Sequence, residues 1–141
     1  MKKILIPFDG SDNALRAVRY AATAAQEKPS LELELLHVLD PTTFKSQAAL
    51  LSPEELSRLY PDEAVHVLQP ARQILDQAGI PYKVRCRVGP AASEIAAQVH
   101  ESGCDGVIMG TRGMGLIANV MIGSVASRVV YLVDVPVTLI K

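Results

Sequence analysis

The stretch from Asp105 to Ser124 reads Asp-Gly-Val-Ile-Met-Gly-Thr-Arg-Gly-Met-Gly-Leu-Ile-Ala-Asn-Val-Met-Ile-Gly-Ser, and it decides how the rest of the chain is interpreted. Residues 105–109 are expected to form a short buried strand, because Val107, Ile108 and Met109 are apolar. A glycine-rich loop follows and ends at Gly123, directly before an apolar helical pattern over about residues 124–133. Strand, glycine-rich loop and helix in this order are typical of an α/β protein.

The alternation of strand and helix continues in both directions from this stretch. We expect further strands over 3–8, 31–39, 82–88 and 136–140, and further helices over 12–27, 62–78 and about 92–102. Residues 41–61 are the least regular, with a helix start at Ser52-Pro53 that Pro61 interrupts. The order β-α-β-α-β-α-β-α-β predicts one α/β domain over 1–141, an open parallel sheet with helices on both faces.

Length and composition exclude several classes of protein. The chain has 141 residues, a formal net charge of −1, and only four Tyr, two Phe and no Trp. Nucleic-acid binders normally carry a basic surplus and stacking aromatics, so we expect no nucleic-acid partner. No signal peptide or membrane span is apparent, and Cys86 and Cys104 suit free thiols, so we expect a cytoplasmic protein.

The strand over 82–88 alternates strictly between apolar and basic residues. One face carries the apolar side chains of Tyr82, Val84, Cys86 and Val88. The other face carries the basic side chains of Lys83, Arg85 and Arg87. A central strand of a parallel sheet is covered on both faces and would be apolar throughout. This strand is therefore expected at a sheet edge, with its basic face in solvent.

Ligands of open parallel sheets bind beyond the carboxyl ends of the strands, where the strand order reverses. The first and fourth strands are the most apolar, and turns at Asp9-Gly10-Ser11 and at Gly110 to Gly113 follow them. Ser124 is expected to cap the next helix, whose free N–H groups attract an anion such as phosphate, and Arg112 adds charge. A loop that merely connects strand and helix remains the alternative.

Several known nucleotide or phosphate motifs are missing from these turns. The chain has no G-x-x-x-x-G-K-[ST] loop and no G-x-G-x-x-G fingerprint after the first strand. A phosphorylatable Asp is also absent after the third strand, where Val88-Gly89-Pro90 stands. These absences exclude a P-loop enzyme, a dinucleotide-binding domain and a receiver domain.

The spacing Gly110-x2-Gly113-x9-Gly123-Ser124 resembles the ATP-binding motif of the universal stress protein family. Other segments match that family in order: Lys3 to Ser11, Leu35 to Val38, Val88 to Ile95, and the ending Val135-Pro136-Val137. The resemblance covers nearly the whole chain except residues 41–61. Two departures are Ala14, where many members have Ser, and the run from Leu116 to Ile122, which lacks the frequent Lys or Arg.

The resemblance implies a Rossmann-like sheet of strand order 3-2-1-4-5 with ATP between the first and fourth strands. Asp9 and the Val38 backbone would line the adenine and ribose, and Met109 and Gly110 would lie against the ribose. Pro7 and Arg112 are assigned to the same site. The phosphates would bind to Gly113, Gly123, Ser124 and Val125, and a divalent metal such as Mg usually accompanies them. Family members pair the last strand with its copy, so we expect a homodimer through Pro136, Val137, Thr138, Leu139 and Ile140.

Three functions are compatible with this interpretation. The first is an ATP-binding regulatory or stress-response dimer that controls an unknown protein partner. The second is an ATPase. Its turnover should be slow, because no side chain of the motif is an obvious general base and no P-loop Lys is present. The third is an interaction module without nucleotide, in which residues 41–61 are the partner surface. No catalytic residue and no side-chain metal ligand is assigned.

Overall fold

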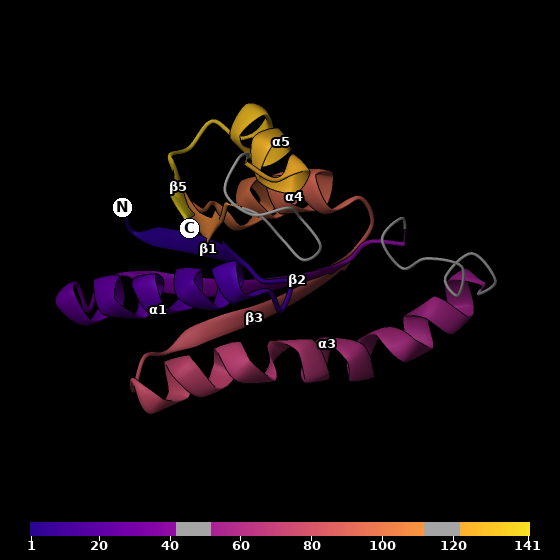
Figure 1. Ribbon diagram of the computed structural model, residues 1–141, viewed down its shortest axis with the longest axis horizontal. Helices are drawn as coiled ribbons and strands as arrows, with labels where there is room; N and C mark the ends of the chain where they lie inside the picture. The colour runs from indigo at the N-terminus through magenta and orange to yellow at the C-terminus, as the bar shows by residue number, and fades with distance from the viewer. Residues whose placement is uncertain (42–51, 112–121) are drawn as a thin grey trace.

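The computed structural model describes residues 1–41, 52–111 and 122–141 and contains a five-stranded parallel sheet of order β3-β2-β1-β4-β5. This confirms the predicted α/β class and strand order. Helices α1 and α3 cover one face of the sheet, and α4 and α5 cover the other (Figure 1). The strands are β1 (Lys3–Pro7), β2 (Glu32–Leu39), β3 (Tyr82–Val88), β4 (Gly106–Gly110) and β5 (Val137–Ile140), and the helices are α1 (Asp12–Glu27), α3 (Pro53–Gln77), α4 (Ala91–Ser102) and α5 (Ser124–Leu132).

Strand β2 divides its side chains between two apolar cores. Leu33 and Leu35 belong to the core under α1 and α3, whereas Leu36 belongs to the core under α4 and α5. Successive side chains of a strand point to opposite faces, so a strand covered on both sides is apolar at nearly every position. This explains the apolar second half of the strand, which lies between two layers of helices.

Small residues allow α1 to lie close to the sheet. Ala17 and Ala21 are completely buried on the inner side of the helix. The helix begins at an N-cap, Ser11, whose hydroxyl oxygen accepts a hydrogen bond from the N–H of Ala14 at 3.2 Å. A side chain of this kind satisfies one of the N–H groups that a helix start leaves open. Ser11 therefore fixes the point at which α1 begins.

Helix α3 runs through two prolines, and the predicted interruption at Pro61 is wrong. The helix extends from Pro53 to Gln77 and includes both Pro61 and Pro70. A proline removes one backbone hydrogen bond and can bend a helix without ending it. Figure 1 shows that α3 changes direction along its length. Buried Leu68, Ala71 and Leu75 hold the second half of the helix against the sheet.

Strand β3 lies at the sheet edge, as its alternation predicts, but its basic face is not simply solvated. Arg87 is partly buried and bonds three side chains of α4: Glu94 at 2.8 Å, Gln98 at 3.0 Å and Glu101 at 2.6 Å. Its guanidinium thus attaches the edge strand to the helix layer. The expectation that all three basic residues face water holds for Lys83 and Arg85, which are exposed, and fails for Arg87.

The two cysteines differ in exposure, and we expect them to differ in reactivity. Cys86 is exposed on β3, whereas Cys104 is buried. Burial, together with the nearby carboxylates of Glu34 and Asp105, raises the pKa of the Cys104 thiol to about 11. Since the thiolate is the reactive form, Ellman's reagent at pH 8 should modify one thiol of the native protein quickly and the second only after denaturation. The substitution Cys86→Ser should abolish the fast phase; a fast phase that survives it contradicts the assignment.

None of the helices in the described part of the chain is long and apolar enough to cross a membrane.

Candidate nucleotide site at the carboxyl ends of β1 and β4

Strands β1 and β4 are neighbours, as predicted, but they are paired only over their first residues. The β1–β2 register continues to Pro7↔Leu36, whereas the β1–β4 register ends at Leu5↔Val107. Pro7 has no N–H with which to continue a ladder. The buried proline therefore lies at the point where β1 loses its pairing with β4, next to the place where the strand order reverses.

The turn after β1 places Asp9 at this end of the sheet. The Oδ1 atom of Asp9 accepts a hydrogen bond from the N–H of Ser11 at 2.9 Å, and Gly10 between them has φ +87°. Side chains of this type mimic a backbone turn, and glycine tolerates the positive φ. Asp9 is exposed, so its carboxylate shapes the turn, while Ser11 alone caps α1.

Gly110, the last residue of β4, is required by close packing against α1. A Cβ atom at this position would lie 2.8 Å from Cβ of Asn13 and 3.1 Å from N of Ala14. The first turn of α1 therefore lies directly against the end of β4. The sequence predicts Gly110 as part of a ligand cradle, and the structure adds a packing reason for this glycine.

Helix α5 begins at the same end of the sheet, and its N-cap is Gly123, not Ser124 as predicted. Gly123 has an extended backbone, φ −61° and ψ 158°, and its carbonyl oxygen accepts the first helical bond from Ser127 N at 2.9 Å. Ser124 is thus the first helical residue and is exposed, with Val125 half-buried after it. Glycine has no side-chain oxygen to offer, so the N-cap residue itself supplies no side-chain cap to this helix. Its first N–H groups and exposed hydroxyl suit an anionic ligand such as a phosphate.

A main-chain bond joins this helix start to β4. The N–H of Gly123 donates to the carbonyl oxygen of Thr111 at 2.6 Å. The two ends of the glycine motif that the structure describes, Gly110 and Gly123, are therefore brought together. Arg112 and Gly113, which the sequence assigns to the same site, lie outside the described residues. The side chain of Met109 is buried in the core under α4 and α5, so only its backbone lies toward the strand end.

The end of β2 supplies the remaining predicted residue, Val38, and two polar neighbours. Val38 is half-buried on the face covered by α4. His37 is buried on the other face, and burial lowers its pKa although the Asp9 carboxylate opposes the shift, so the imidazole is neutral at pH 7. Asp40 accepts a hydrogen bond from Ala91 N at 3.0 Å and so caps α4 across the sheet.

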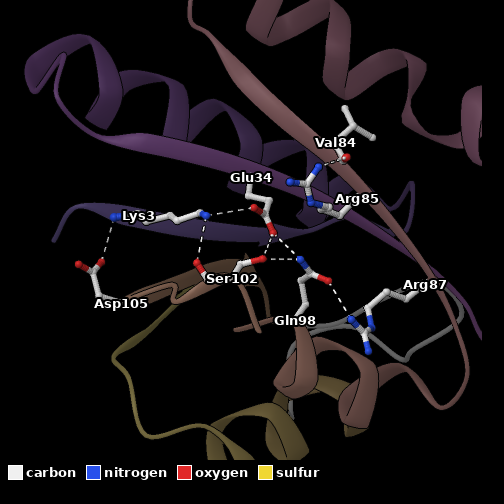
Figure 2. A network of polar contacts seen from close by, with 8 residues as sticks. All are labelled: Lys3, Glu34, Val84, Arg85, Arg87, Gln98, Ser102 and Asp105. Atoms are coloured by element: carbon white, nitrogen blue, oxygen red, sulfur yellow. Dashed lines mark hydrogen bonds and ion pairs between the residues drawn. The ribbon is translucent and has the colours of Figure 1, made fainter. Parts of the chain in front are cut away.

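A second polar network lies at the opposite end of the sheet, and sequence analysis missed it. The Glu34 side chain is completely buried between β2 and α4. Its Oε1 accepts hydrogen bonds from Gln98 Nε2 at 2.6 Å and Ser102 Oγ at 2.8 Å, and its Oε2 lies 3.5 Å from Lys3 Nζ. Figure 2 shows the carboxylate between Lys3 and the two α4 side chains, with Arg85 above it.

Burial opposes ionisation of Glu34, but its partners outweigh that cost. Hydrogen bonds from Ser102 and Gln98, with the positive charges of Lys3 and Arg85, hold the pKa of Glu34 below its ordinary value. The group is therefore a carboxylate at neutral pH. The sequence does contain a signal that Glu34 is buried. Leu36 and Val38 lie on the same face of the strand and are apolar, which indicates that this face is covered.

Comparison with known proteins decides the family of the chain. A sequence profile of the universal stress protein family matches residues 1–141. The chain belongs to the universal stress protein family. This universal stress protein carries the family's glycine motif on the elements described above, at the end of β4 and the start of α5.

Three relatives show how far the similarity extends. Universal stress protein MJ0531 of Methanocaldococcus jannaschii is 31% identical over 140 residues, covering 99% of this chain and 82% of its own length. The solved structure of MJ0577 from the same organism is 30% identical, with a TM-score of 0.84 over 99% of this chain and 95% of that chain. A universal stress protein from Archaeoglobus fulgidus, solved in complex with dAMP, is 23% identical, with a TM-score of 0.72 over 100% and 98% of the two chains.

Proposed function

We propose that this universal stress protein binds ATP between the carboxyl ends of β1 and β4 and acts as a cytoplasmic, nucleotide-dependent regulatory dimer in a stress response. The observation that carries the proposal is the helix start at Gly123, a residue that offers no capping side chain of its own and whose N–H is bonded to Thr111, the residue after Gly110. An anion there would meet the first N–H groups of α5 and the hydroxyl of Ser124.

The adenine half of the ligand is assigned to the ends of β1 and β2. Asp9 is exposed at the first of these ends and can accept hydrogen bonds from ribose hydroxyls. Val38 offers an aliphatic surface and its backbone groups to the base. The A. fulgidus relative binds dAMP, which contains the same base, and this supports an adenine nucleotide as the ligand of the present chain.

The proposed ligand is the magnesium complex of ATP, with the cation held mainly by phosphate oxygens. Among the described residues, no three His, Cys, Asp or Glu side chains gather in a way that would hold a metal. Mg²⁺ is commonly bound through substrate phosphates and water, with few protein ligands. The metal and the N-terminus of α5 would together neutralise the negative charge of the phosphates.

Isothermal titration of the purified protein with Mg-ATP tests the proposal. Saturable binding of one nucleotide per chain is the expected result, and AMP should compete with lower affinity because it lacks the phosphates that α5 would bind. GTP tests the base preference. No saturation at millimolar nucleotide would refute the proposal, and mass spectrometry of nucleotide that co-purifies with the protein would identify the natural ligand.

The dimer is assigned to the open edge of β5. Pro136 accepts a hydrogen bond from Val107 in β4, and Ile140 accepts one from Thr111, directly after β4. The residues Val137 and Leu139 therefore turn their N–H and C=O groups away from β4. The sheet ends at this strand, and an unpaired edge with apolar side chains favours pairing with another strand. A second copy related by a two-fold axis would pair β5 with itself.

The substitution Leu139→Pro should convert the dimer to a monomer. Proline removes an N–H that points to the open edge, and it leaves in place the bonds that the carbonyl oxygens of Pro136 and Ile140 accept. Leu139→Ala is the matched control, because it shortens the same side chain and keeps the N–H. Size-exclusion chromatography with light scattering should show a monomer for the first variant and a dimer for the second; two dimers would contradict the assigned interface.

A further inference from the structure

Thr111, the first residue after β4, joins three segments through three different atoms. Its N–H donates to the carbonyl oxygen of Ile140 in β5 at 2.8 Å, and its carbonyl oxygen accepts from the N–H of Gly123 at 2.6 Å. Its hydroxyl oxygen accepts a hydrogen bond from Asn13 Nδ2 at 3.1 Å. The start of α5, the end of β5 and the first turn of α1 therefore meet at one residue.

A further pair of bonds closes these contacts into a ring. The Oδ1 atom of Asn13 accepts from Arg16 Nη2 at 2.7 Å, and Arg16 Nε donates to the carbonyl oxygen of Lys141 at 2.6 Å. Because Lys141 follows Ile140 directly, the path Thr111–Asn13–Arg16–Lys141–Ile140 returns to Thr111. These five residues are called the Thr111 ring below. Asn13 is buried, so a broken bond would leave its amide without compensation from water.

Packing prevents the ring from moving separately from β4. The backbone of Asn13 lies so close to Gly110 that even a Cβ atom would not fit between them. Thr111 is thus held by α1 through its hydroxyl oxygen and by β5 through its N–H. A shift at the start of α5 must either break the bond to Thr111 or act on the whole ring.

We infer that the Thr111 ring couples the proposed nucleotide site at the start of α5 to the open edge at β5, so that nucleotide and a second copy of this chain strengthen each other's binding. The inference rests on the proposed function, because it requires both binding events. A nucleotide on the first N–H groups of α5 orders Gly123 and, through it, Thr111. The side chains of Asn13 and Arg16 then transmit this order from Thr111 to the last residues of β5. A partner strand on β5 orders the same residues from the other side. Whichever binds second, the nucleotide or the partner strand, then loses less conformational entropy, because the first has already ordered the same residues.

Linkage makes this coupling measurable from either side. If nucleotide tightens the dimer by some factor, dimerisation must tighten nucleotide binding by the same factor. The dimer dissociation constant can be measured by sedimentation velocity with and without saturating Mg-ATP. For the wild-type protein we expect nucleotide to lower this constant by about five-fold or more, which is the usual lower range of such couplings.

Substitutions at Thr111 separate coupling from mere stability. Thr111→Val keeps the shape of the side chain and loses the bond from Asn13, so the nucleotide effect on the dimer constant should fall to less than about two-fold. Thr111→Ser keeps the hydroxyl and should keep the effect. Each ratio is taken within one variant, so a general change in dimer strength does not imitate a loss of coupling.

A second site of substitution keeps the test decisive if Thr111→Val does not fold. Arg16 is exposed, and Arg16→Ala removes the contact with Lys141 without opening the core, so this variant should also lose the nucleotide effect. Arg19→Ala, an exposed arginine on the same helix and outside the ring, is the matched control and should behave as wild type.

The possible outcomes distinguish the inference from the function on which it rests. A wild-type protein that binds nucleotide with an unchanged dimer constant overturns the coupling and leaves nucleotide binding in place. A wild-type protein that binds no nucleotide refutes the proposed function and the coupling together. Full nucleotide effects in both Thr111→Val and Arg16→Ala would overturn the role of the Thr111 ring.

Discussion

The substitution Gly123→Val should lower the affinity for Mg-ATP by at least about 100-fold, since losing two hydrogen bonds to a charged group costs about 1.5–3 kcal/mol each. Gly123 is the buried N-cap of α5, directly before the N–H groups assigned to the phosphates. A branched side chain there would occupy the space that the ligand needs. The backbone itself tolerates the change, because φ −61° and ψ 158° lie in a region that any residue adopts.

Titration calorimetry of the variant measures this loss, and thermal unfolding shows that the fold is kept. Ser127→Val is the matched control, because it places the same side chain on an exposed position one turn further along α5. The control should bind nucleotide as the wild type does. A Gly123→Val protein that binds with near wild-type affinity would show that the phosphates lie elsewhere.

The substitution Glu34→Ala should lower the free energy of unfolding by about 3 kcal/mol, which is typical of removing one member of a buried charged pair. The change leaves Gln98 Nε2 and Ser102 Oγ without their acceptor at the interface between β2 and α4. It also removes the carboxylate near Lys3 Nζ. Urea unfolding measures the effect. Glu32→Ala, on the same strand and exposed, should cost less than about 0.5 kcal/mol.

The pH dependence of the Glu34 effect identifies its electrostatic origin. The pKa of Glu34 is lowered in the folded protein, so its stabilisation is fully present above the unfolded value of about 4.3 and is lost as pH falls through the folded value. Glu34→Gln keeps the shape and cannot ionise. Wild type and Glu34→Gln should therefore differ at pH 7 and converge as the solution is acidified below about pH 4. A constant difference would assign the effect to packing.

Periodicity and spacing predicted the architecture because each strand shows its environment in its own sequence. The strands β1 and β4, which are the most apolar, lie inside the sheet, and the alternating β3 lies at the edge where it was expected. The prediction failed at Pro61, since local preference cannot report the packing that maintains α3 past its first turns. It also failed for Arg87, whose acidic partners on α4 come from a different segment of the chain.

The candidate site was predictable where a motif carries it, and not where distant residues complete it. The glycine spacing located the ends of the motif at β4 and α5, but it could not assign the cap to Gly123 in preference to Ser124, because both residue types suit that position. Asn13 and Thr111 are ordinary polar residues in the sequence. They are 98 residues apart in the sequence, and only the fold brings Asn13 Nδ2 to 3.1 Å from the hydroxyl oxygen of Thr111.

The pairing of β1 with β4 has a consequence for how fast a ligand binds. Pro7 offers no N–H, and the register between these strands ends at Leu5↔Val107. A ligand that arrives between the strand ends therefore has no ladder hydrogen bond to break there before it settles. Sites arranged in advance lose little binding free energy to reorganisation. We expect the observed rate constant of binding to rise in proportion to nucleotide concentration without a plateau, because no opening step of the sheet precedes binding.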